Sequence, residues 1–183
     1  MKNLKQLYSA TQISQRIDAL ANEISDDFKD LERPVVIGVL KGAIFFLSDL
    51  VRRMKTADSL QIEFVHLSSY GSARESTGRI QTPYLDLPNI SHRHILIVED
   101  IVDSGRTSRF FIDYLNDQFA PASIRLASFL DKPSGRVLDV HPDYTGFTID
   151  KVFVVGYGLD YGGESGDCFR ELPYLATLNL EIE

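Results

Sequence analysis

The sequence has little cysteine, no long apolar run and a deficit of positive charge. A single cysteine, Cys168, among 183 residues excludes an intramolecular disulfide and favours a reducing compartment. No segment approaches the roughly 20 consecutive apolar residues of a membrane span, and residues 1–14 have no apolar centre of signal-peptide length. From these absences we expect a soluble, cytoplasmic protein that contacts no membrane.

Acidic residues outnumber basic ones. The chain has 19 Lys and Arg against 26 Asp and Glu, a formal net charge of −7. This balance argues against broad, non-specific binding of nucleic acid, so no nucleic-acid partner is expected, and an anionic ligand would need a local basic site. A length of 183 residues with 44% hydrophobic residues suits one domain with an ordinary core.

Two common nucleotide-binding motifs are missing. No segment matches the P-loop, and the glycine-rich run at residues 156–162 lacks both the dinucleotide spacing and a following helical pattern. We therefore expect neither an ordinary kinase nor a nucleotide-cofactor dehydrogenase.

Apolar residues alternate between strand-like runs and helical periodicity. The runs cover residues 35–40, 60–67, 95–98, 124–130, 152–155 and 176–180, and the helical spacing covers residues 11–28, 43–54 and 110–119. This alternation predicts an α/β fold with a mostly parallel, twisted sheet, helices on both faces and ligands at the carboxyl ends of the strands. The long polar interval at residues 68–89 is either disordered or a functional lid.

The most informative segment begins with the strand at residues 95–98. Glu99 and Asp100 follow it, and their carboxylates can accept hydrogen bonds from a vicinal diol or approach a hydrated cation. Ribose offers such a diol. The pair is therefore a candidate ribose or cation site.

A turn from Asp103 to Thr107 then leads into a helix. Gly105 permits close approach of the backbone, so successive N–H groups form an anion site, to which Ser104, Thr107 and Ser108 add hydroxyl donors. The turn predicts a site for a ribose 5′-phosphate. The alternative is that Ser104 and Thr107 only cap the helix.

Residues 98–107 closely resemble the diphosphoribosyl-binding motif of type I phosphoribosyltransferases. Segments 38–43, 68–72, 131–133 and 152–161 narrow the resemblance to the hypoxanthine-guanine phosphoribosyltransferases, from about residue 35 to the C-terminus. The resemblance implies one domain, residues 1–183, with a core at about 35–150. A small hood would come from the N-terminal segment and residues 151–183.

The resemblance also implies an activity in purine salvage. The phosphoribosyl group of phosphoribosyl diphosphate would pass to N9 of hypoxanthine or guanine with Mg²⁺, giving IMP or GMP and diphosphate. Family members of this kind suggest a homodimer or homotetramer.

Site residues follow by resemblance, segment by segment. The phosphate turn would comprise Asp103, Ser104, Gly105, Arg106 and Thr107. Diphosphate would be bound by Lys41, Gly42 and Arg170. In the family, the loop of Lys41 and Gly42 often has a non-proline cis peptide after the equivalent of Leu40. Asp160 would approach the metal together with Glu99 and Asp100, and Ser69 and Tyr70 would begin a closing lid. The glycine-rich link at residues 161–169 is longer than the usual pattern, which bears on the assignment of Arg170.

Four residues would contact the purine: Lys132, Phe153, Val154 and Asp160. Lys132 matches the lysine that donates to O6, and because an ammonium has donors only, it suits hypoxanthine or guanine and opposes the amino group of adenine. Phe153 would stack on the base and Val154 would offer backbone groups. The alternative for Phe153 and Val154 is a place in a strand core.

Asp103 resembles the acid-base residue that exchanges a proton with purine N7. It could equally organise the phosphate turn by accepting backbone N–H bonds, and the sequence leaves both open. Three other functions also remain: a xanthine-preferring enzyme, a regulator that senses phosphoribosyl diphosphate, and an interaction domain with no site.

Overall fold

A computed structural model describes residues 3–56, 59–67, 86–150, 152–161 and 168–179. Its strands are β1 (Asn3–Tyr8), β2 (Val35–Leu40), β3 (Gln61–His66), β4 (His94–Val102), β5 (Ser123–Asp131), β6 (Tyr144–Thr148), β7 (Val154–Val155) and β8 (Leu175–Asn179). Its helices are α1 (Ala10–Phe28), α2 (Ile44–Val51), α3 (Arg106–Phe119) and a 3₁₀-helix, η1 (Pro133–Gly135).

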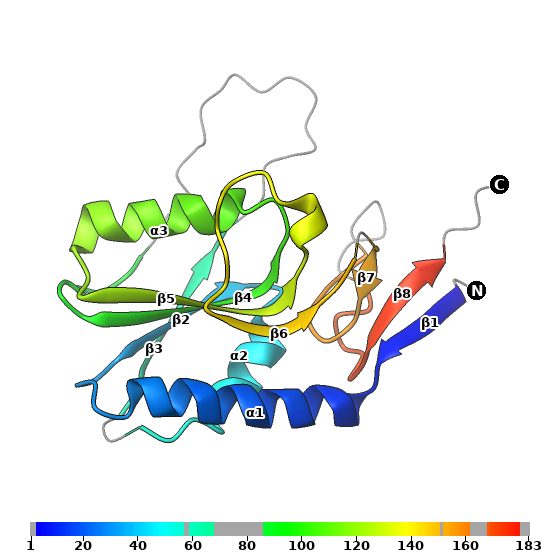
Figure 1. The fold of residues 1–183 in the computed structure, drawn as a ribbon, viewed down its shortest axis with the longest axis horizontal. Helices are drawn as coiled ribbons and strands as arrows, with labels where there is room; N and C mark the ends of the chain where they lie inside the picture. The colour runs from blue at the N-terminus through cyan, green and yellow to red at the C-terminus, as the bar shows by residue number, and fades with distance from the viewer. Residues whose placement is uncertain (1–2, 57–58, 68–85, 151, 162–167, 180–183) are drawn as a thin grey trace.

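Five parallel strands form the main sheet, in the order β3-β2-β4-β5-β6 (Figure 1). The chain leaves β2 toward one edge, to form β3, and then returns to the other side of β2 to form β4. The carboxyl ends of β2 and β4 therefore flank the point where the strand order reverses, which is where open α/β sheets bind ligands.

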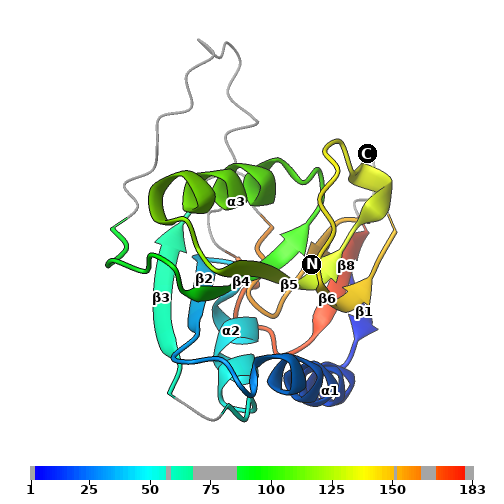
Figure 2. The ribbon, with the colours of Figure 1, turned by 60° about the vertical axis from the view of Figure 1, so that its left-hand side comes forward.

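Helices cover both faces of this sheet (Figures 1 and 2). α3 lies on one face, and α1 and α2 lie on the other. Alternate residues of β4 serve the two sides: Leu96 and Val98 pack in the core with α1 and α2, and Ile95 and Ile97 in the core with α3. Burial on both faces explains why β2 and β4 read as continuous apolar runs.

α1 matches the predicted periodicity closely. A capping box begins the helix: the Ser9 side chain accepts from the Gln12 amide, and the Gln12 side chain accepts from the Ser9 amide. Ile13, Ile17 and Ile24 form part of its buried stripe. The helix thus covers the sheet through the face that the sequence indicated.

A second, smaller sheet is antiparallel and has the order β1-β8-β7. Its strands come from both terminal segments, and β1 and β8 lie side by side beyond the end of α1 (Figure 1). We call this sheet the hood. The predicted α/β fold with a hood of terminal segments is confirmed, whereas the division of a single domain near residues 35 and 150 stays a prediction.

The structure adds to the predicted elements and shifts their limits. β1 and β6 were not predicted, α2 is shorter than the periodic stretch at 43–54, and β4 continues through Glu99 and Asp100 to Val102. β6 carries Gly146, where a Cβ would lie 2.3 Å from the carbonyl oxygen of Phe129. The glycine lets β6 approach β5 closely but weakens the sequence pattern of a strand.

Within the described residues, no helix has the length and apolar character that crossing a bilayer requires.

Candidate active site

A cavity of about 670 Å³ opens at the carboxyl ends of β2 and β4. The cavity thus lies where the strand order of the sheet reverses, which is the usual ligand site of an open α/β sheet. Most of the candidate residues from the sequence line it: Lys41, Gly42, Glu99, Asp100, Asp103, Ser104, Gly105, Thr107, Asp160 and Arg170.

The turn between β4 and α3 forms one wall of the cavity. Gly105 is the N-cap of α3, has a φ of 80°, and provides no side-chain cap. The nearest approach to a cap, from the Arg106 amide to Ser104 Oγ, is long at 3.4 Å. Amide groups at the start of α3 therefore remain suited to bind an anion, and a role of Ser104 and Thr107 as simple helix caps is not supported.

Ser108 differs from its predicted role as a donor to phosphate. Its side chain is buried, and its hydroxyl donates to Glu99 Oε2 at 3.0 Å. Its donor is therefore used within the protein, and Ser108 fixes the orientation of an acid that lines the cavity.

Glu99 and Asp100 lie inside the last part of β4 rather than after it. Burial, together with the charge of Asp100, raises the pKa of Glu99 to about 8, against a smaller opposing effect of the Ser108 hydrogen bond. Burial also raises the pKa of Asp100 to about 6, although the Ile101 amide donates to its carboxylate at 2.9 Å. The two acids therefore hold protons more readily than exposed carboxylates do.

The loop after β2 packs directly against Asp100. A Cβ at Gly42 would lie 1.5 Å from Asp100 Oδ2, so a larger residue here would displace the Asp100 carboxylate. The peptide between Leu40 and Lys41 is cis, as the resemblance implied. The predicted diphosphate loop and the predicted ribose acids are thus in direct contact across β2 and β4.

Asp103 and Lys132 are brought together at the cavity edge. Lys132 Nζ lies 3.5 Å from Asp103 Oδ2. Gly135 packs against the other side of the same carboxylate, because a Cβ there would lie 1.8 Å from Asp103 Oδ1. Two residues that were assigned to purine chemistry are therefore neighbours.

Asp160 and Arg170 form a pair on the hood side of the cavity. Arg170 Nη2 lies 2.8 Å from Asp160 Oδ2, and Arg170 Nη1 donates to the carbonyl oxygen of Gly158 at 2.6 Å. The predicted contacts of these two residues with diphosphate and metal stay predictions.

Several candidate residues do not line the cavity itself. Among the described residues that line the cavity, Arg106, Lys132, Phe153 and Val154 do not occur. Phe153 is half exposed and meets Tyr161 edge to face, with ring centroids 5.8 Å apart, whereas Val154 is buried in β7. Ser69 and Tyr70, the predicted lid, and residues 162–167 of the glycine-rich link lie outside the described residues.

Sequence reasoning missed Arg136, whose hydrogen bonds stabilise the phosphate turn. Its Nε donates to the carbonyl oxygen of Asp103 at 2.8 Å, its Nη2 donates to that of Val102 at 3.1 Å, and it pairs with the carboxylate of Asp131. The amides of Val137 and Leu138 add hydrogen bonds to the carbonyl oxygen of Ser104, both at 3.0 Å. An arginine soon after the Asp131-Lys132-Pro133 segment was the available signal.

The acids fit a cation that the protein would share with a substrate. Glu99 Oε1 is buried and has no hydrogen-bond partner among the described residues. No group of three or more His, Cys, Asp or Glu within the described ranges is arranged to hold a metal ion by itself. Mg²⁺ usually takes one or two carboxylates and completes its shell with water and substrate phosphates, so a site of this composition suits it.

Fold and site together define a phosphoribosyltransferase: a parallel sheet with a hood, a phosphate-binding turn and paired acids at the switch point. The sequence model of the family described as "Phosphoribosyl transferase domain" matches residues 3–162. The hypoxanthine-guanine phosphoribosyltransferase of Streptococcus pneumoniae (strain ATCC BAA-255 / R6) is 38% identical over 97% of this chain and 94% of its own length. The chain belongs to the hypoxanthine-guanine phosphoribosyltransferase family.

Two further relatives extend the comparison. A crystal structure of a hypoxanthine-guanine phosphoribosyltransferase from Bacillus anthracis, with HEPES in its active site, has a TM-score of 0.84 and 36% identity, over 98% of this chain and 100% of that one. The bifunctional protein TilS/HprT of Listeria monocytogenes serotype 4b (strain F2365) is 38% identical over 97% of this chain. The chain spans only 26% of that longer protein.

Proposed function

We propose that this chain transfers the 5-phosphoribosyl group of phosphoribosyl diphosphate to N9 of hypoxanthine or guanine, giving IMP or GMP and diphosphate, with Mg²⁺ as cofactor. The observation that carries the proposal is the placement of the Asp103 and Lys132 pair beside the phosphate turn. It puts groups suited to a 6-oxopurine next to groups suited to a ribose phosphate.

Phosphoribosyl diphosphate would lie along the cavity. Its 5′-phosphate would bind the amides of the turn at residues 103–107, at the positive end of α3. Glu99 and Asp100 would accept hydrogen bonds from the ribose hydroxyls. The diphosphate would meet the loop of Lys41 and Gly42 from one side and Arg170 from the other. The supporting observation is that Lys41, Gly42, Glu99, Asp100, Arg170 and the residues of the turn except Arg106 line one cavity.

The purine would lie toward Lys132. In transfer, the bond between C1′ and the diphosphate oxygen breaks and a bond from N9 to C1′ forms, so the base must lose a proton. Asp103 would accept it at N7, within hydrogen-bond reach, while Lys132 donates to O6. O6 and N7 are neighbours on one edge of the purine, which matches the 3.5 Å between the two side chains.

Mg²⁺ would supply charge neutralisation on the diphosphate as it departs. Glu99, Asp100 and Asp160, which line the same cavity, are the acids that would hold it together with substrate oxygens.

We also propose a cytoplasmic protein that acts as a homodimer or homotetramer. The single cysteine supports a reducing compartment. Exposed apolar side chains on α2 and on the edge strand β3 support association with another copy. These side chains are Ile44, Phe45, Ile62 and Phe64.

Product formation tests the proposed function. We would incubate the chain with phosphoribosyl diphosphate, hypoxanthine and Mg²⁺, and quantify IMP and diphosphate by chromatography. The proposal predicts equal amounts of both products, and loss of both when EDTA removes the metal. Diphosphate without IMP, or undiminished product in EDTA, would contradict it.

A further inference from the structure

A network of polar contacts outside the cavity joins two of its walls. We propose that Tyr157 is a positioning residue, whose hydrogen bond to Asp49 holds two cavity loops in register. One loop carries Lys41 and Gly42, and the other carries Asp160. The inference rests on the proposed function, because that function assigns Lys41 and Gly42 to the diphosphate and Asp160 to the Mg²⁺ beside it.

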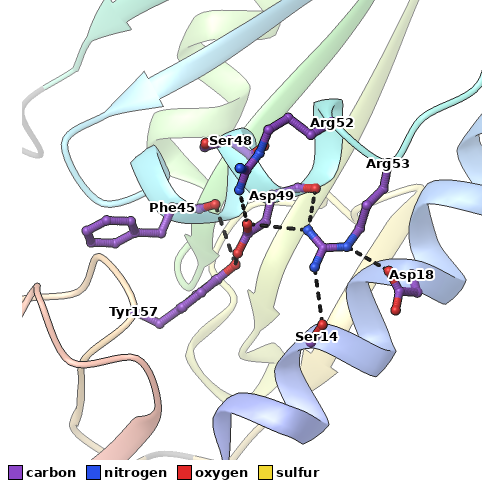
Figure 3. A network of polar contacts seen from close by, with 8 residues as sticks. All are labelled: Ser14, Asp18, Phe45, Ser48, Asp49, Arg52, Arg53 and Tyr157. Atoms are coloured by element: carbon purple, nitrogen blue, oxygen red, sulfur yellow. Dashed lines mark hydrogen bonds and ion pairs between the residues drawn. The ribbon is translucent and has the colours of Figure 1, made fainter.

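The contact is a short hydrogen bond to a fixed carboxylate (Figure 3). The Tyr157 hydroxyl donates to Asp49 Oδ2 at 2.5 Å, and the other oxygen of Asp49 lies 2.6 Å from Arg52 Nη2 and 3.3 Å from Arg53 Nη1. Arg53 also reaches α1, where its Nε lies 2.6 Å from Asp18 Oδ1. Burial acts to raise the pKa of Asp49, but bonds from Tyr157 and Arg52 and the charge of Arg53 lower it overall. An ionised carboxylate is the stronger acceptor.

The backbone of Tyr157 indicates that its surroundings hold it in place. Gly156 and Leu159 exchange hydrogen bonds of 2.9 and 3.1 Å, which makes Tyr157 and Gly158 the central residues of a tight turn. Both have positive φ, 48° and 99°. Glycine adopts this conformation readily, whereas an aromatic residue rarely does. The Tyr157 ring is buried, and its centroid lies 4.9 Å from that of Phe129.

The same turn touches both groups of cavity residues. A Cβ at Gly158 would lie 2.0 Å from the carbonyl oxygen of Gly42, so the turn lies directly on the predicted diphosphate loop. The carbonyl oxygen of Gly158 holds Arg170, which in turn pairs with Asp160. Any shift of this turn would therefore move both walls relative to each other.

The hydrogen bond closes a ring of contacts. Asp49 lies in α2, and α2 begins shortly after Gly42. From Gly42 the ring runs through α2 to Asp49, across to Tyr157, along the turn to Gly158, and back to Gly42. Lys132, which the proposed function assigns to the base, takes no part in it. Loss of the Tyr157 hydroxyl should therefore weaken binding of phosphoribosyl diphosphate more than binding of the base.

The direct test is Tyr157→Phe, which removes the hydroxyl and keeps the ring. We expect the KM for phosphoribosyl diphosphate to rise about tenfold, the scale of one hydrogen bond to a charged group, and the KM for hypoxanthine to change less than about twofold. Tyr144→Phe is the matched control. The buried Tyr144 donates to Asp27 Oδ2 at 2.6 Å, between β6 and α1. Its substitution by phenylalanine should leave both KM values unchanged.

A double-mutant cycle then tests the pair. Asp49→Ala should raise the KM for phosphoribosyl diphosphate in the same way, and Tyr157→Phe should add little in that background. Unchanged KM values in Tyr157→Phe, equal rises in both KM values, or an equal effect of Tyr144→Phe would each overturn the inference. Calorimetric binding of phosphoribosyl diphosphate needs no turnover, so it tests Tyr157 even if transfer to hypoxanthine, and with it the proposed function, fails.

Discussion

Lys132 Nζ lies 3.5 Å from Asp103 Oδ2, and parallel pairing of two strands brings them there. Asp103 follows Val102 at the end of β4, Lys132 follows Asp131 at the end of β5, and Val102 and Asp131 are partners in the sheet. The Lys132 amide donates to the carbonyl oxygen of Val102 at 3.0 Å, which fixes the register past the strand ends. The pair is thus built on the sheet rather than on a free loop.

Asp103→Asn should slow transfer and spare nucleotide binding. The amide keeps the size of the side chain but cannot accept the N7 proton, so we expect kcat to fall by about a hundredfold or more, the usual contribution of a general base. Binding of IMP, measured by calorimetry, should change by less than about threefold, because the turn amides do not depend on the carboxylate charge. A variant with normal kcat would remove Asp103 from the acid-base role.

Lys132→Ala should weaken the choice between bases. The variant loses the donor to O6, so we expect the KM for hypoxanthine to rise about tenfold or more. The ratio of kcat/KM for hypoxanthine to that for adenine should fall, because the repulsion toward the adenine amino group is also gone. Initial rates with each base provide both numbers. An unchanged ratio would show that base selection lies elsewhere.

Arg136→Lys tests whether the hydrogen bonds of Arg136 hold the phosphate turn in place. Lysine keeps the charge beside Asp131 but loses the planar fork that reaches the carbonyl oxygens of Val102 and Asp103. We expect kcat to fall about tenfold, from the less precise placement of Asp103.

The matched control for this variant is Arg125→Lys. Arg125 Nη1 lies 2.8 Å from Asp143 Oδ1 in an exposed pair, remote from the turn. The Arg125→Lys substitution should leave kcat unchanged and alter the free energy of unfolding by less than about 1 kcal/mol. Equal effects of the two substitutions would argue against a specific role for Arg136.

The stability of the ligand-free protein should fall as pH rises from 5 to 8. Glu99 has a pKa of about 8 when folded but near 4.5 when unfolded, so between these values the unfolded chain holds fewer protons than the folded one. Each pH unit in this window then lowers the free energy of unfolding by at most about 1.4 kcal/mol for one such group.

Glu99→Gln isolates this effect, because a glutamine stays neutral. Urea unfolding in EDTA at pH 5 and pH 8 should show a smaller loss of stability in the variant than in the wild type. All other carboxylates are common to both proteins, so the difference reports Glu99 together with its charge coupling to Asp100. The same loss in both proteins would mean that Glu99 is already ionised at pH 5.

The sequence predicted the strands and helices whose apolar residues follow the pattern of their burial. β2 reads as an apolar run because both faces are covered, and α1 shows its buried stripe directly. β6 was missed because it has five residues with Gly146 at its centre. The limit of β4 was misplaced because Glu99 looks like the end of a buried strand, yet its carboxyl is itself buried.

The site was predicted where its residues adjoin in sequence, as in the turn at residues 103–107. Contacts made across the fold had little or no local signal. Arg136 reaches Asp103 through a segment after β5, and Tyr157 reaches Asp49 between the hood side and α2. Phe153, just before β7, is half exposed and meets Tyr161 edge to face, and its role by resemblance stays a prediction.

The most direct test of the Asp103 and Lys132 pair is diphosphate release from phosphoribosyl diphosphate and Mg²⁺, with hypoxanthine, guanine, xanthine or adenine offered separately. The pair predicts release with hypoxanthine or guanine and little with adenine. The rate with xanthine, the third 6-oxopurine, shows where it ranks relative to hypoxanthine and guanine. Release with adenine as fast as with hypoxanthine, or none with any base despite tight binding of phosphoribosyl diphosphate, would contradict a transferase selective for 6-oxopurines.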